Sequence, residues 1–164
     1  MNKLITFLLL FTCFSSYAGT EKTYFYDCSY EKDSIIKMIQ KWQNLTELKL
    51  ETKTNESFTF YFESEATYLQ KKKITPYGFY QFRVQILFKD GKIKFRSYDF
   101  IHKTSSQYLC SGGDLESEKS QCSEDQISSD MWSEFKKQAK EKSEGFIQNF
   151  EVFLKENFGE PNKF

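Results

Sequence analysis

The chain has 164 residues, a formal net charge of zero, 18% aromatic residues, four cysteines and a single histidine. This length fits one small domain, and zero net charge lacks the electrostatic signature of a general nucleic-acid-binding protein. One histidine excludes a metal site built from several histidines, and 28% charged residues exclude a polytopic membrane protein.

Residues 1–18 have the pattern of a secretory signal peptide. Lys3 gives a basic start, residues 4–14 form a largely apolar run of eleven, and Ala18 ends a small-residue cleavage pattern. As a helix this run rises only about 16 Å, too short for a bilayer. We therefore predict an exported protein, periplasmic or secreted. A lipoprotein anchor at Cys13 is disfavoured because Thr12 poorly fits the small residue expected before the cysteine.

Three cysteines remain once the signal is removed, and thiols in an oxidising compartment tend to pair. Cys110 and Cys122 lie twelve positions apart, and the shortest loop has the lowest closure cost. We predict a disulfide between them, which leaves Cys28 as a free, buried thiol. A zinc site made from the three cysteines and His102 is disfavoured because the chain has no C-x-x-C pair.

The first elements expected along the chain are a strand, a helix and two further strands. Residues 23–28 are aromatic-rich, which suits a strand. Alternation then begins after residue 44 and predicts strands around 48–50 and 58–62, joined by a turn at 54–56. A polar stretch follows and closes at Gly78. The helix between the first two strands rests on four residues at the spacing of one helical face: Ile35, Ile36, Ile39 and Trp42.

A β-hairpin is the strongest local signal. Apolar residues alternate strictly from Tyr80 to Phe88, and Asp90-Gly91 is a two-residue turn sequence. The predicted register sets Phe88 opposite Ile93 and Ile86 opposite Phe95, so that the apolar faces coincide. The opposite face is polar and mostly basic: Arg83, Gln85, Lys89, Lys92, Lys94 and Arg96.

The last third of the chain is a polar loop followed by one long helix. Residues 104–128 lack periodicity and carry the predicted disulfide, and we expect a helix over 129–158. Ser128 or Ser129 can cap its start, Gly159 fits its end, and Gly145 marks a bend or close packing. Its apolar stripe, and most other aromatic residues, are expected to fill the core: Trp132, Phe135, Ala139, Phe146, Phe150, Phe153 and Leu154.

This order, β-α-β-β-β-β-α, resembles the secreted Bacteroidetes domain of unknown function 4468, which has a TBP-like fold. The resemblance rests on the helix at 34–42 with its terminal Trp42, and on the strand running through Lys89-Asp90-Gly91-Lys92 to Phe95-Arg96. It covers residues 33–102. It implies an α+β fold, with an antiparallel sheet covered by helices on one face, and an export route. It implies no catalytic residues. The expected organisation is a signal peptide (1–18), a TBP-like core (19–103), a disulfide-containing acidic loop (104–128) and a C-terminal helix (129–158).

Motifs for catalysis or metal binding are lacking, so we predict a non-enzyme without cofactor or metal. No G-x-S-x-G elbow accompanies His102, which we expect to be an exposed residue at a strand end. Acidic residues from Asp114 to Asp125 mimic a calcium loop, but Lys119 stands where that loop needs glycine. A hydrolase that uses His102 as its base remains an alternative.

Neutral total charge hides two regions of opposite sign. Residues 66–103 contain nine basic and two acidic residues, whereas residues 104–130 contain six acidic residues and one lysine. The two regions either neutralise each other or are solvated, or the basic face binds a partner. We predict an exported binding or accessory protein whose partner is a protein or an anionic envelope ligand, not nucleic acid; an inhibitor or immunity-type protein is the alternative. The candidate surface is Tyr61, Arg83, Gln85, Lys92, Lys94, Arg96 and Tyr98.

Overall fold

Two helices and six strands make up the computed structural model, which describes residues 21–25, 32–89, 92–106 and 109–159. Cys28, the signal sequence and the turn residues Asp90 and Gly91 lie outside the described residues. The elements are β1 (Glu21–Phe25), α1 (Lys32–Gln43), β2 (Lys49–Lys53), β3 (Ser57–Gln70), β4 (Lys73–Lys89), β5 (Lys92–Lys103), β6 (Gly113–Asp114) and α2 (Ser129–Phe158).

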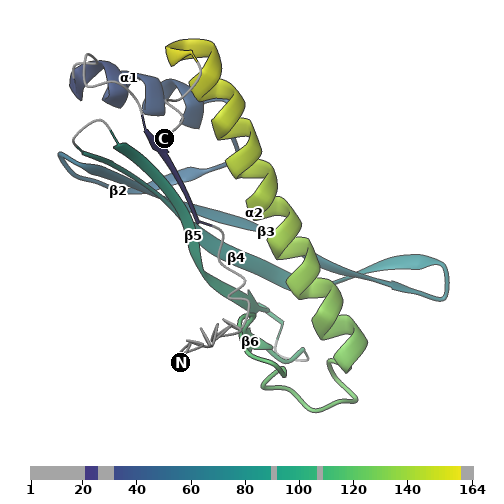
Figure 1. Ribbon diagram of the computed structural model, residues 1–164. Helices are drawn as coiled ribbons and strands as arrows, with labels where there is room; N and C mark the ends of the chain where they lie inside the picture. The colour runs from purple at the N-terminus through teal and green to yellow at the C-terminus, as the bar shows by residue number, and fades with distance from the viewer. Residues whose placement is uncertain (1–20, 26–31, 90–91, 107–108, 160–164) are drawn as a thin grey trace, which may run out of the picture.

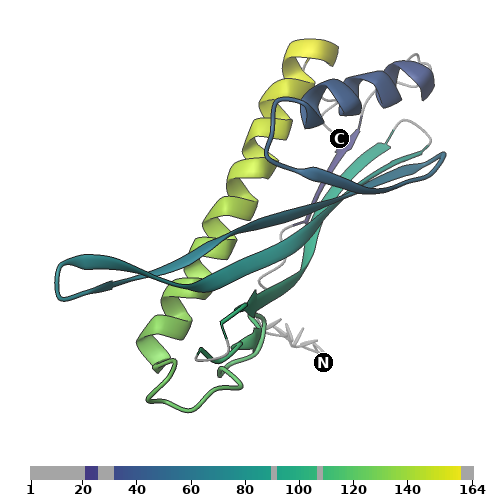
Figure 2. The ribbon, with the colours of Figure 1, turned by 180° about the vertical axis from the view of Figure 1, so that it is seen from behind.

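The strands form one antiparallel sheet in the order β1-β5-β4-β3-β2, and the short β6 pairs with β5. Both helices lie on one face of this sheet (Figures 1 and 2). The α+β class, the antiparallel sheet and the placement of both helices on one face are as predicted, whereas the spatial order of the strands and the short β6 come from the structure. The hairpin register is also confirmed, because Phe88 pairs with Ile93 and Ile86 pairs with Phe95.

Strands β3 and β4 are longer than the sequence pattern predicts. Residues 64–78 were expected as a polar connection, but pairing continues outward to Gln70 opposite Lys73. Lys71 and Lys72 form the two-residue turn with φ of 47° and 67°. Such a turn needs positive φ at both central residues, and its usual residues are Asn and Gly. Because this turn consists of two lysines, the sequence did not indicate a hairpin here, and its far end is exposed.

The core lies between the sheet and the two helices and is built largely from aromatic rings, as predicted. Trp42 of α1 packs edge-on against Phe150 of α2, with ring centroids 4.8 Å apart, and also against Phe60 of β3. Phe146 of α2 contacts Phe62 in the same way at 5.1 Å. Because aromatic side chains are large, few residues are enough to fill the thin core between one sheet and two helices.

Helix α2 begins and ends as the sequence predicts. The Ser128 hydroxyl accepts a hydrogen bond from the Met131 backbone N–H, and Gly159 ends the helix with φ of 78°. Gly145 was expected to mark a bend or close packing, and a Cβ atom built there meets no neighbour within 4 Å. Close packing therefore does not explain this glycine, and the helix runs through it without interruption. Neither helix in the described part of the chain is long and apolar enough to cross a lipid bilayer.

Candidate functional site

The sheet face opposite the helices is covered by no described element, and Figure 2 shows it toward the viewer. Alternation along each strand puts core residues on one side and the candidate residues on the other. In register, Arg83 of β4 lies between Tyr61 of β3 and Tyr98 of β5. We call the seven predicted residues the open face: Tyr61, Arg83, Gln85, Lys92, Lys94, Arg96 and Tyr98.

Arg83 stands at the centre of the open face and is held by two carboxylates. Its Nε and Nη2 donate to the two oxygens of Glu51 at 2.7 and 2.8 Å, and its Nη1 donates to Asp99 at 2.8 Å. Hydrogen bonding to Glu51, then to Asp99, raises the pKa of Arg83, and the same bond lowers the pKa of Glu51. The guanidinium is fixed in place by these bonds and is not available as a free anion receptor.

A second polar network surrounds Tyr61. The hydroxyl of Tyr61 donates to Glu63 at 2.6 Å and accepts from Lys103 at 3.2 Å, and Lys103 also forms an ion pair with Glu63 at 2.8 Å. Partial burial and the bond to Glu63 raise the pKa of Tyr61. The hydrogen bond from Lys103 lowers the pKa of Glu63. Tyr61 therefore stays protonated at neutral pH and is a poor base or nucleophile.

Cationic groups remain along the β4–β5 side of the open face. Arg96 donates from Nε to the Gln85 side-chain oxygen at 2.7 Å, and its guanidinium lies 5.0 Å from the centre of the Tyr98 ring. The open face is therefore less basic than the sequence suggests. The acids that balance Arg83 and Lys103 lie on other strands of the sheet and not in the acidic loop. Asp99 is on β5, adjacent to the strand of Arg83, whereas Glu51 and Glu63 each reach their partner from two strands away.

His102 is buried, so the expectation of an exposed strand-end histidine is wrong. Asp99 has φ of 56° and interrupts the β4–β5 register. Inward residues change there from odd positions such as Phe95 to even positions such as Phe100, and His102 follows that new phase into the core.

The His102 ring joins three parts of the fold. Its Nδ1 accepts from the Gly112 backbone N–H at 3.0 Å, so the proton resides on Nε2, which donates to the Tyr77 carbonyl at 2.7 Å. The ring stacks on Phe135 of α2 with centroids 4.8 Å apart. Burial lowers the pKa of His102, opposed by the bond to Tyr77. Both nitrogens are occupied, so this histidine has no free atom to act as the base of a hydrolase or as a metal ligand.

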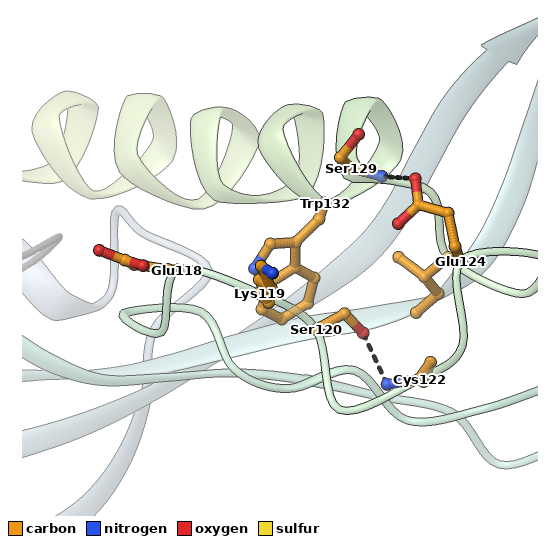
Figure 3. Close-up of a pocket in the computed structure, with 8 residues that line it drawn as sticks. Glu118, Lys119, Ser120, Cys122, Glu124, Ser129 and Trp132 are labelled. Atoms are coloured by element: carbon orange, nitrogen blue, oxygen red, sulfur yellow. Dashed lines mark hydrogen bonds between the residues drawn. The ribbon is translucent and has the colours of Figure 1, made fainter.

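The disulfide loop confirms the predicted Cys110–Cys122 pairing, with an S–S distance of 2.04 Å. Its cysteines are thus unavailable to zinc, and no three His, Cys, Asp or Glu side chains in the described ranges are grouped to hold a metal ion. Beside the loop, Trp132 closes a cavity of about 180 Å³, where Glu124 accepts from the Ser129 backbone (Figure 3). This volume is below the roughly 300 Å³ at which ligand pockets begin. The open face is the stronger candidate.

Two solved structures share this fold. One is a DUF4468 family protein from Bacteroides ovatus, with a TM-score of 0.56 and 9% identity over 89% of this chain and 88% of that one. The other is a TBP-like protein from Parabacteroides distasonis, with a TM-score of 0.54 and 11% identity over 83% of this chain and 92% of that one. They support the resemblance drawn from the sequence, at the level of fold. Comparison with protein-family models and with curated proteins gives no match.

Proposed function

We propose that this chain is an exported, non-catalytic protein that binds a protein partner through the open face. The observation that carries the proposal is the row Tyr61–Arg83–Tyr98, which crosses three paired strands on the uncovered side of the sheet. Tyrosine and arginine are the side chains most enriched where protein interfaces concentrate their binding energy.

The mixed charge of this surface favours a protein over a polyanion. Glu51 and Asp99 flank Arg83, and Glu63 lies beside Tyr61, so negative charge is interleaved with positive charge. A nucleic acid or an anionic polymer would be repelled by these carboxylates, whereas a protein surface can present both signs in register.

Rigidity is the second support. Arg83 makes three hydrogen bonds to carboxylates, and Arg96 is held between Gln85 and the Tyr98 ring. Side chains already fixed in the free protein lose little rotamer entropy on binding. A paired sheet also positions them more firmly than loops would.

Export is supported by the N-terminal sequence pattern together with the disulfide. Disulfides persist in oxidising compartments such as the periplasm and the extracellular space. The Cys110–Cys122 bond has the geometry of an ordinary disulfide, with Cα atoms 5.8 Å apart.

The test is affinity capture from an envelope extract of the producing cell. The double variant Arg96→Ala/Tyr98→Ala should weaken the partner's binding by at least about 30-fold, the effect of one interface hot spot. Lys137→Ala/Lys140→Ala is the matched control, because these exposed lysines lie on α2 away from the open face. Equal recovery of the partner with both variants, or no stoichiometric partner with the wild type, contradicts the proposal.

A further inference from the structure

The outer end of the β3–β4 hairpin extends beyond the rest of the sheet. Strand β5 pairs with β4 only as far as Phe79, and β2 pairs with β3 only as far as Tyr61. Residues 67–76 therefore form a two-stranded arm, which projects past α2 in both views (Figures 1 and 2). We call these ten residues the basic arm.

Three lysines stand together at the tip of the basic arm. Lys71 and Lys72 form the turn, and Lys73 begins the return strand. All three are exposed, and none forms an ion pair with another residue that the structure describes. Residues 67–76 contain no acidic residue, so the tip carries three uncompensated positive charges.

Two large aliphatic side chains lie directly beside these lysines. Leu69 and Ile74 are cross-strand partners with exposed fractions of 65% and 73%. Tyr68, which precedes Leu69 in β3, packs against the core. Because side chains alternate along a strand, Leu69 points away from the core. Leu69 and Ile74 thus form an apolar pair that covers no residue in the described part of the chain.

The base of the arm is fastened to the body of the protein. The Gln138 side chain of α2 donates to the Thr67 carbonyl at 2.7 Å and accepts from the Thr67 backbone N–H at 3.1 Å. These bonds lie next to the register shift between Glu65 and Thr67. They hold both backbone polar groups of Thr67, so the tip is presented in a fixed direction from α2.

We propose that the tip of the basic arm inserts into the surface of an anionic lipid bilayer. The chemistry fits, because lysines attract acidic headgroups while an aliphatic pair enters the boundary with the acyl chains. A specific protein interface buries roughly 1,000 Å² or more of closely matched surface in total. A bilayer needs no such area. This inference is independent of the open face, which contains no residue of the arm.

The test is partition of the full chain between buffer and vesicles, either phosphatidylglycerol-rich or purely zwitterionic, at low salt. We expect binding to the anionic vesicles only. The triple variant Lys71→Gln/Lys72→Gln/Lys73→Gln should lower the partition coefficient on the order of 100-fold, about fivefold per lysine. Its matched control, Lys119→Gln/Lys137→Gln/Lys140→Gln, removes the same charge from other exposed positions and should bind as the wild type does.

Insertion has a separate readout. The two natural tryptophans, Trp42 and Trp132, are only 2% and 3% exposed. In Leu69→Trp the fluorescence emission of the introduced tryptophan should shift to shorter wavelength with anionic vesicles and not with zwitterionic ones. Leu69→Ser/Ile74→Ser should weaken binding, whereas Leu45→Ser/Val152→Ser, at other exposed aliphatic positions, should not.

Three results overturn the proposal. One is equal loss of binding in the lysine control and in the tip variant, which would make the attraction a general charge effect. Another is a Leu69→Trp spectrum that anionic vesicles leave unchanged. The third is a wild-type chain that does not bind vesicles but captures a protein that the tip lysine variant no longer captures, which would identify a protein contact.

Discussion

Acidification below about pH 6.5 should destabilise this protein through the buried side chain of His102, the single histidine of the chain. His102 is fully buried, and its neutral ring is bonded at both nitrogens. Burial lowers its pKa below the ordinary value of 6.5. As the pH falls below that value, His102 takes up a proton in the unfolded chain but not in the folded chain. The free energy of unfolding is therefore at its full value above about pH 6.5 and declines below it.

The size of the effect follows from proton linkage. The loss between pH 7.5 and 5.5 is at most about 1.4 kcal/mol for a single group with an unfolded pKa near 6.5, the limit reached when the folded ring takes up no proton in that range. Two glutamates with shifted pKa values affect the free energy of unfolding at lower pH. The pKa values of Glu51 and Glu63 are lowered from 4.5, so their contribution is present above that pH and is lost only in more acidic solution. The chain has no second histidine to obscure the result.

The assay is denaturant unfolding at pH 7.5 and at about pH 5.5, followed by the fluorescence of the buried Trp42 and Trp132. His102→Gln serves as the control, because its side chain does not titrate and its stability should be unchanged between the two pH values. Proton NMR of the wild type gives a check that needs no variant, since one histidine gives one set of ring resonances. A ring that titrates near pH 6.5 in the folded protein refutes the reasoning. So does an equal change in the free energy of unfolding between the two pH values in the wild type and in His102→Gln.

Three further substitutions or treatments follow from the packing, each measured by chemical or thermal unfolding. Gly145→Ala should stabilise by about 0.5–1 kcal/mol, because alanine favours the helix and its Cβ meets open space; a loss of stability contradicts this. Gly112→Ala should destabilise by about 1–3 kcal/mol, because its Cβ would lie 2.4 Å from the buried Trp132 ring; a neutral effect refutes it. Reduction of Cys110–Cys122 should cost about 3 kcal/mol, the loop-closure value for this separation, and an unchanged midpoint contradicts it.

Much of this fold is predictable from local patterns. Alternation from Tyr80 to Phe88, with matching apolar residues at Ile93 and Phe95, fixes the central hairpin register that the structure shows. The stripe of α2 and its caps at Ser128 and Gly159 are equally local signals. In these segments one periodicity runs without interruption, so spacing and burial agree.

Three features required tertiary information. A change of alternation phase at Asp99 moves His102 into the core, and an aspartate with positive φ has no distinctive sequence pattern. The basic arm is exposed and turns at Lys71-Lys72, so neither a buried face nor a typical turn sequence indicated it. The partners of Arg83 were also missed, because Glu51 and Asp99 come from strands whose distance from Arg83 depends on the strand order.

The most direct test of the open face is site-specific photo-crosslinking in the producing cell. A photoreactive amino acid is placed at Gln85, within the open face, and in a second protein at Gln148, on the exposed side of α2. The proposed function predicts a discrete adduct with one envelope protein from position 85 and none from position 148. An adduct from position 148 alone, or the same adduct from both, would contradict it.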